Sequence, residues 1–394
     1  MRLASEFGPR AVPGRWLAGD FHVHAVGASN DTGPESTPEH IKEVAVARGL
    51  DFVVLTDHSN SAGSDTTTRD EDPDLFNQGP EFPYWDKAAE LSDDTFLMVD
   101  GSEISPVDDP AVDPTGHVGC YPRSLVTFNP DIAFIDRPRG TITSADTVAQ
   151  ARAAGCFVTV NHPFFATFWI AWDWTTRDYD AMEVFNGSAG WDQFDYFGVS
   201  GWACDQSQGR RVTAIGGSDN HRADIEPPGG FGDPALGWPA TWVWSGALDW
   251  PGIVRSLDAG RVSVSDTGDP LDIDVYDTER RWLGFAGSTL SADTPVLVRV
   301  RGALHNSDGQ VRVLQILRVA PDACDDRREV GKITAPQVAF DMLHEVEIGP
   351  DEAFDVHVEA TFGPGEFVFG WLHPGRSDVI NVHGAAVTNA VHFD

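Results

Sequence analysis

The chain has 394 residues and a formal net charge of −34, and only three of its basic residues are lysines. A field of that sign repels nucleic acid and anionic membranes, so the charge predicts neither as a partner. Single cores stop growing at roughly 250–300 residues, so we expect two domains. The acidity is typical of adaptation to the host's salt or genome composition, although a negative surround would also concentrate cations at a metal site.

Cysteine usage and hydropathy bear on the compartment. The four cysteines (Cys120, Cys156, Cys204 and Cys324) show no C-x-x-C spacing, so a disulfide framework is not expected. The apolar or mixed segments around the first three indicate packing instead. No apolar leader precedes Gly19, and no run of about 18 apolar residues occurs. We therefore predict neither a signal peptide nor a membrane span and take the cytoplasm as the default. The oligomeric state is open.

Hydrophobic patterning predicts alternating strands and helices in the first two thirds of the chain. Strands are expected at 20–24, 51–55, 96–100, 157–160, 182–185 and 212–215, and helices after an N-cap at Thr37, at 144–154 and at 249–259. From about Asp269 the residues alternate between apolar and polar with no clear helix, which predicts an antiparallel β module. We place the domains at 1–268 and 269–394.

Metal-type side chains recur at the ends of these strand-like segments. In the sequence His-Val-His, residues 22 and 24 point the same way because alternate strand residues share a face. The first βαβ unit, with its right-handed crossover, brings His58 to the same edge of the sheet. The remaining strand ends carry more ligand-type residues: Glu103, His117, His162, Asp219 and His221.

A lone strand-end histidine is more often structural, but six of them with carboxylates indicate a polynuclear metal site. A carboxylate such as Glu103 can bridge two cations, which imidazole cannot do, so it is the natural centre of a metal pair. Nitrogen and oxygen ligands without thiolate are compatible with zinc, manganese or iron.

These motifs in this order (H-x-H, T-D-H, G-x-E, G-H, N-H-P and G-S-D-x-H) resemble the PHP (polymerase and histidinol phosphatase) family. The added Gly-His-Val-Gly-Cys-Tyr-Pro and Met-Glu-Val-Phe-Asn-Gly segments and the β-rich C-terminal part are most similar to its carbaryl-esterase-like (CehA/McbA) branch. The resemblance spans roughly residues 19–267. It implies an α/β fold, a distorted (β/α)7 TIM-like barrel, with two or three divalent metal ions.

Carried over residue by residue, the resemblance implies three sets of ligands. A first metal would be held by His22, His24, Glu103 and Asp219, and a second by Glu103, His117 and His162. A third would use His58 and His221 with a residue of the loop after H-x-H. That loop departs from the family's Ser-Asp-Gly pattern, so we choose Asp31 and leave Asn30 or no ligand as alternatives.

Several residues around the motifs have two interpretations. Asp57 is expected to orient His58 or a neighbour. Glu183 is either a strand-end carboxylate paired with arginine or a pocket residue, and Arg222 is either a surface ion pair or a ligand for an anionic substrate. The aromatic run 164–174, with Phe165 and Trp169, either plugs the barrel end or forms an apolar wall of the substrate pocket.

Together these features predict a metal-dependent hydrolase in which a metal-bridged hydroxide cleaves an ester, with Glu103, His58 and Asp219 as catalytic residues and His58 as a candidate proton donor. Few lysines and many aromatics favour a neutral or aromatic small-molecule ester: a phosphotriester, carboxyl ester or carbamate. The alternative is a phosphate monoester or diester phosphoesterase. A non-catalytic metal- or carbohydrate-binding protein is the third interpretation.

Overall fold

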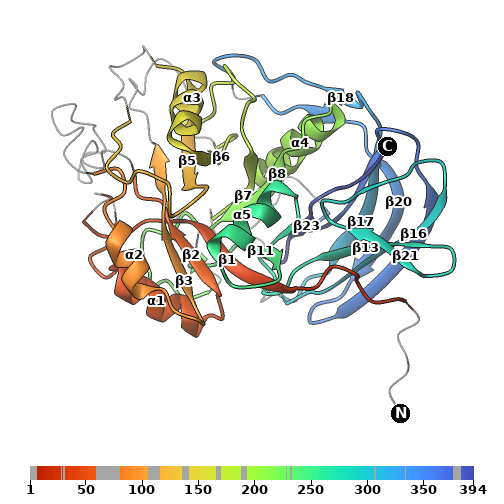
Figure 1. The fold of residues 1–394 in the computed structure, drawn as a ribbon. Helices are drawn as coiled ribbons and strands as arrows, with labels where there is room; N and C mark the ends of the chain where they lie inside the picture. Colours follow the sequence, from red (N-terminus) through yellow and green to blue (C-terminus); the bar gives the residue numbers. More distant parts are fainter. Residues whose placement is uncertain are drawn as a thin grey trace.

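The N-terminal two thirds of the chain alternate between strands and helices (Figure 1). The computed structural model describes residues 7–27, 29, 32–58, 80–104, 116–134, 142–165, 170–187, 193–227, 229–230, 233–305, 308–332, 334–375 and 383–394. Within these ranges the helices are α1 (Pro38–Ala47), α2 (Trp85–Leu91), α3 (Ser144–Ala154), α4 (Gln193–Ser207) and α5 (Trp250–Asp258). None of them is long and apolar enough to cross a membrane.

Helix ends follow from local capping. The Thr37 side chain accepts a hydrogen bond from the His40 amide, and Pro38 occupies the first turn of α1, as predicted. Thr143 and Asp146 form a capping box at α3, which ends at Gly155 with φ of 94°. The predicted helices are therefore confirmed, whereas α2 and α4 were not predicted.

The N-terminal two thirds of the chain form two large sheets and the two-stranded pair β9–β10. The strands are β1 (Arg15–Val23), β2 (Phe52–Leu55), β3 (Leu97–Asp100), β4 (Ser102–Ile104), β5 (His117–Pro122), β6 (Cys156–Asn161), β7 (Ala181–Asn186), β8 (Thr213–Gly217), β9 (Gly229–Gly230), β10 (Asp233–Pro234), β11 (Ala240–Ser245) and β12 (Val262–Ser265). One sheet runs β12-β11-β1-β2-β3, with β1, β2 and β3 parallel. The other runs β4-β5-β6-β7-β8 and is parallel only from β6 to β8.

The two sheets are joined by isolated bridges between Val23 and Asn220 and between His58 and Glu103. The mixed α/β class is thus confirmed, but the ladders do not close continuously into a barrel. The antiparallel pairing of β4 with β5 and of β5 with β6 interrupts the regular parallel βαβ pattern on which a (β/α)7 barrel depends. The barrel remains a prediction.

The C-terminal third is β-rich, as expected, and packs beside the first part (the blue strands of Figure 1). Its strands are β13 (Asp272–Asp277), β14 (Trp282–Phe285), β15 (Thr289–Leu290), β16 (Pro295–Ala303), β17 (Arg312–Val319), β18 (Cys324–Asp325), β19 (Gln337–Val338), β20 (Asp341–Ile348), β21 (Ala353–Thr361), β22 (Phe367–His373), β23 (Ala386–Thr388) and β24 (Val391–Phe393). Strand β23 pairs directly with β12, so one sheet runs through both parts of the chain.

Two disulfides correct the expectation that the cysteines are unpaired. Cys120 and Cys156 lie on neighbouring strands β5 and β6 with Cα atoms 5.1 Å apart. Cys204 of α4 bonds to Cys324 of β18, 120 residues later, with Cα atoms 5.2 Å apart. Sequence spacing could not reveal these pairs, because each is created by a contact between separate elements.

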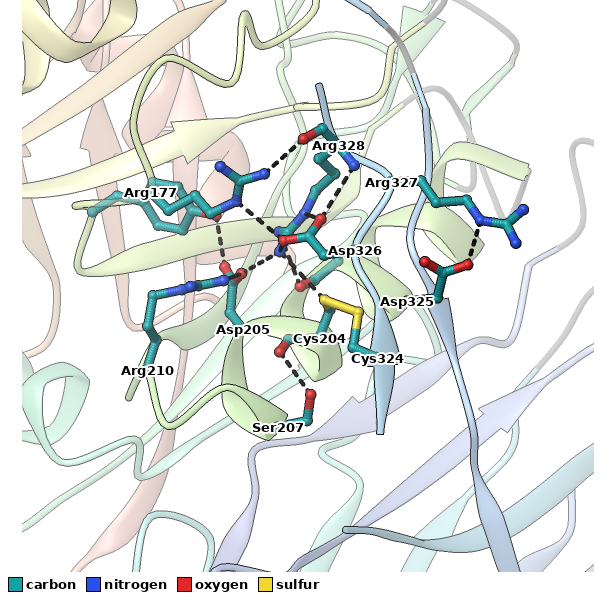
Figure 2. The surroundings of a disulfide bond; sticks show 12 residues. Arg177, Cys204, Asp205, Ser207, Arg210, Cys324, Asp325, Asp326, Arg327 and Arg328 are labelled. Carbon is teal, nitrogen blue, oxygen red and sulfur yellow. Dashed lines mark hydrogen bonds and ion pairs between the residues drawn. A yellow bond between two sulfur atoms is a disulfide. The ribbon is translucent and has the colours of Figure 1, made fainter. Parts of the chain in front are cut away.

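A buried ionic cluster surrounds the second disulfide (Figure 2). The Arg328 guanidinium, which is fully buried, donates to Asp205 Oδ1 at 2.7 Å and to Asp326 Oδ1 at 2.7 Å. Its Cζ lies 4.9 Å from the centroid of the Trp174 ring. Asp205 also accepts from the Tyr179 hydroxyl at 2.6 Å. Covalent and ionic contacts therefore fasten the segment that carries β18 onto α4.

Thiol labelling tests the disulfide assignment. The native protein should react at no cysteine and the reduced, unfolded protein at all four, as counted by mass spectrometry. Replacing both Cys204 and Cys324 by alanine should lower the free energy of unfolding by about 2–5 kcal/mol. The Cys120–Cys156 disulfide closes a loop of 36 rather than 120 residues, so the matched Cys120/Cys156 double variant should lose less unfolding free energy. Native thiols that label without reductant would contradict the pairing.

Candidate metal centre

Eight of the nine predicted ligands converge at the ends of strands from both sheets. His22 lies in β1 and Glu103 in β4, His117 opens β5, and the others come within four residues after β1, β2, β6 and β8 (His24, His58, His162, Asp219 and His221). The ninth, Asp31, lies outside the described residues, as does the alternative Asn30.

Glu103 occupies the middle of this cluster and is fully buried. Its Oε1 lies 3.1 Å from His22 Nε2, 3.0 Å from His117 Nδ1 and 3.2 Å from His162 Nε2. Its Oε2 lies 3.0 Å from His58 Nδ1. A single carboxylate thus faces imidazoles from four segments, which is the arrangement expected of a bridging ligand.

Asp219 is the second carboxylate of the cluster and is more exposed than Glu103. Its Oδ1 lies 3.1 Å from His24 Nε2 and 3.2 Å from His22 Nε2. The His221 ring stacks on that of His24 with centroids 4.0 Å apart. Asp219 and His162 have φ of 56° and 29°, values rare outside glycine, and such strain concentrates at functional sites.

Ligand atoms fall into four overlapping groups, in each of which they lie within 4.8 Å of one another: His24–His58–His221, His22–His24–Asp219, His22–Glu103–His162 and His58–Glu103–His117. This donor set of imidazoles and carboxylates fits divalent cations such as zinc, manganese or iron. The grouping differs in detail from the three predicted sets, because His58 lies beside Glu103 and His117 as well as beside His221. Which residues hold which ion stays a prediction.

Burial and neighbouring charges shift the pKa values of the clustered residues strongly, in opposite directions for different residues. Burial raises the pKa of the Glu103 carboxyl, but His117 and His22 outweigh this and hold it well below its usual range. Burial together with His221 and His58 lowers the pKa of His24 to about 3. Burial also lowers the pKa of His117, to about 4, against the opposing effect of Glu103. Burial lowers the pKa of His22, but the Asp219 and Glu103 carboxylates outweigh it and hold that pKa well above its usual value. A divalent cation would displace such a proton, because metals bind deprotonated carboxylates and neutral imidazoles.

Behind the ligands, acceptors fix the orientation of the imidazole rings. His22 Nδ1 lies 3.0 Å from Glu183 Oε1, so its Nε2 faces the cluster. Glu183 Oε2 accepts from the His162 amide at 2.7 Å and from Asn186 Nδ2 at 3.0 Å. Gly217 permits this packing, because a Cβ there would lie 2.4 Å from that of His22. The structure thus places the predicted pocket residue Glu183, 3 % exposed, behind His22.

A similar chain of contacts holds His24. Its Nδ1 lies 3.0 Å from Ser29 Oγ, which donates to Asp57 Oδ1 at 2.8 Å. Ser29 Oγ also accepts from the His58 amide at 3.1 Å. Asp57 therefore contacts the ligand residues through Ser29, in keeping with the expected orienting role. Sequence reasoning did not identify Ser29, whose segment carries no recognisable motif.

Asn161 and Asn186 were also missed. Asn161 Nδ2 donates to Glu103 Oε1 at 2.9 Å, and its Oδ1 accepts from Thr159 Oγ1. Asn186 Nδ2 lies 3.4 Å from Asp219 Oδ2. Asn161 belongs to the N-H-P motif and Asn186 to the Met-Glu-Val-Phe-Asn-Gly segment. Each is the last residue of its strand, and that position was the available signal of a role at the site.

The predicted substrate-binding residues are placed as follows. Phe165 lies beside the site, with its ring centroid 6.0 Å from that of His162 and 5.8 Å from that of Phe194. Arg222 is exposed. Trp169 lies outside the described residues.

No protein-family model matches this sequence, and comparison with curated proteins finds no match. Among solved structures, similarity is found to a two-domain protein containing a predicted PHP-like metal-dependent phosphoesterase from Bacteroides vulgatus, with 15% identity, a TM-score of 0.44 and coverage of 97% of this chain and 99% of that one. A lesion-specific endonuclease Q from Pyrococcus furiosus is 17% identical, with a TM-score of 0.38, and the match covers 62% of this chain and 56% of that one.

A further endonuclease Q structure, a complex with a 27-mer duplex substrate, is 15% identical with a TM-score of 0.39 over 62% of this chain and 56% of that one. This finding corrects the exclusion of nucleic acid in favour of a small-molecule ester, because a structurally similar protein acts on a duplex. Net charge alone was the wrong ground, since cations at a site can offset a negative surround. At these identities and scores, the functional argument rests on the site itself.

Replacing Glu183 by glutamine tests the orienting role. The amide keeps an acceptor for the His162 amide but loses the charge that faces His22 Nδ1, so metal affinity should fall by about 10- to 100-fold. Metal content after dialysis against graded chelator measures this. The control is Glu279→Gln on an exposed turn. Equal metal retention in both variants would remove Glu183 from the site.

Proposed function

We propose that this chain is a metal-dependent hydrolase that cleaves an ester bond. The observation that carries the proposal is the position of Glu103, buried and within 3.2 Å of imidazole nitrogens from four separate segments. A purely structural core would not gather several imidazoles around one buried carboxylate, because burying ionisable groups is costly unless they coordinate metal or pair. Two or three divalent ions are the expected cofactors.

The roles of the chain's own residues follow from their contacts. Glu103 is the proposed bridging ligand, and Asp219, with a side chain 24% exposed, lies on the side from which a substrate can approach. Glu183 and the Ser29–Asp57 pair fix the imidazoles so that little reorganisation accompanies the reaction. Divalent cations supply Lewis acidity that polarises an ester oxygen and activates water near neutral pH.

Two ester classes are candidates. A neutral or aromatic ester, such as a phosphotriester, carboxyl ester or carbamate, is supported by Phe165, whose ring lies against the ligand His162. A phosphate monoester or diester is supported by the overlapping ligand groups, which could hold paired divalent cations, and such a pair would supply the positive charge that displacement at phosphorus needs. A diester in a nucleic-acid strand belongs to this second class.

Replacing Glu103 by glutamine tests the bridging role. The variant should lose turnover by at least about 100-fold and bind fewer metal ions, because a neutral amide cannot bridge two cations. Metal analysis and steady-state kinetics measure both, with the exposed Glu359→Gln as control. Full activity with unchanged metal content would remove this assignment.

A substrate panel separates the ester classes. Manganese- or zinc-loaded protein would be assayed on p-nitrophenyl phosphate monoester, diester and triester, carboxyl ester and carbamate, and on a DNA duplex with and without an abasic site. Preference for neutral substrates would support a neutral or aromatic ester held beside Phe165. Preference for the anionic phosphate esters would support a phosphate monoester or diester as the substrate. Silence across the panel in metal-loaded protein would contradict the hydrolase and favour a binding protein.

We also propose that the chain matures in an oxidising compartment rather than in the cytoplasm. The support is that all four cysteines are paired. Structural disulfides persist where the thiol pool is oxidised and are rare in the reducing cytosol.

A further inference from the structure

A hollow lies at the opposite end of β8 from the candidate metal centre. Its volume is about 180 Å³, and it is lined by Val212 and Thr213, which lead into β8, whereas Asp219 follows the other end of that strand. Asp258 of α5, Gly260 and His392, of the C-terminal strand β24, are among its other lining residues. The hollow is thus bounded by both parts of the chain and is separate from the metal ligands.

Arg211 supplies a cation to this hollow. Its side chain is 49% exposed, and its ion-pair partner among the described residues is Asp394, at the long distance of 3.7 Å. Burial lowers the pKa of the guanidinium, and Asp394 only partly offsets this. The neighbouring Arg210, by contrast, contacts the fully buried Asp205 directly. Arg211 therefore has the capacity to bind a further anion.

Gln206, in α4, supplies an acceptor. Its side-chain nitrogen donates to the carbonyl of Val212, but its Oε1 is buried and accepts no hydrogen bond from the described residues. The residue is only 7% exposed and lines the same hollow. A buried acceptor without a donor costs free energy, and a bound O–H or N–H group would satisfy it.

Charged groups of both signs line this region. Asp258 lines the hollow and pairs with Arg123 at 2.7 Å. A neighbouring hollow of about 350 Å³, which shares Arg211, is lined by Arg152, Arg177 and Arg210 together with Asp178, Asp180 and Asp258. Figure 2 shows Arg177 and Arg210 reaching the acidic groups around the Cys204–Cys324 bridge. These arginines are ion-paired with aspartates, so their charges are largely balanced. Arg211, whose ion pair is longer, is therefore the lining arginine best able to bind a ligand.

We propose that this hollow binds a small oxyanion that carries its own hydroxyl group, with Arg211 binding the anionic oxygens and Gln206 Oε1 accepting the O–H. Hydrogen phosphate and a small hydroxycarboxylate such as glycolate share this chemistry. Sulfate has the same charge and shape as phosphate but no proton at neutral pH, so it can satisfy Arg211 and not Gln206. The inference is independent of the reaction at the metal centre.

Calorimetric titration of the full, metal-loaded chain with inorganic phosphate, sulfate and glycolate tests the proposal. Phosphate or glycolate should bind at least about tenfold more tightly than sulfate, because sulfate leaves the Gln206 acceptor unsatisfied. The tighter of the two identifies the source of the oxyanion. Phosphate binding at the metals is recognised by its loss on chelation.

Variants decide where the anion binds. Arg211→Ala should weaken binding by about tenfold or more, and Gln206→Leu should reduce phosphate to the level of sulfate. The control is Arg255→Ala, an exposed arginine in the last turn of the nearby helix α5. Absence of binding, equal affinities in the Arg211 and Arg255 variants, or complete loss of phosphate binding on chelation would each overturn the proposal.

Discussion

The burial of Glu103 among imidazoles is the constraint on which the rest of the structure depends. A fully buried carboxylate needs positive charge or hydrogen-bond donors around it, and here imidazoles come from strands of both sheets. Each imidazole must present a nitrogen inward, so each needs support on its other side. The contacts of Glu183 and Ser29 follow from that requirement, and so does the close approach that Gly217 permits.

Much of the N-terminal part could be predicted because its signals are local. Strands with continuous apolar runs, the Thr37 cap and the end of α3 at Gly155 depend on neighbours within a few residues. The convergence of the proposed ligands that follow β1, β2, β6 and β8 was also predictable, since chain direction places the carboxyl ends of parallel strands at one edge, whereas Glu103 and His117 lie on antiparallel strands. Closure of a barrel was not, because it depends on pairing between strands distant in sequence, and here single bridges replace continuous ladders.

Other features were hidden for the same physical reason. Helix α4 has no polar face, because nearly all of its residues after Phe197 are buried between neighbouring elements, so it lacks amphipathic periodicity. Its two glycines weaken the helical signal further. With α4 unseen, the partner of Cys204 could not be inferred. Ser29 and Asn186 likewise gain their importance only from what the fold brings beside them.

The pairing of β23 with β12 has a consequence for how the protein is made. Strands β22, β23 and β24 come from the last 28 residues, 367–394, yet β22 and β23 occupy the interior of the sheet that also contains β1. A nascent chain that has not yet released this segment exposes β12 as an open edge, which is a template for intermolecular pairing. Folding must therefore wait for the C-terminus, and premature termination in that segment would yield an aggregating chain even though every proposed metal ligand had been synthesised.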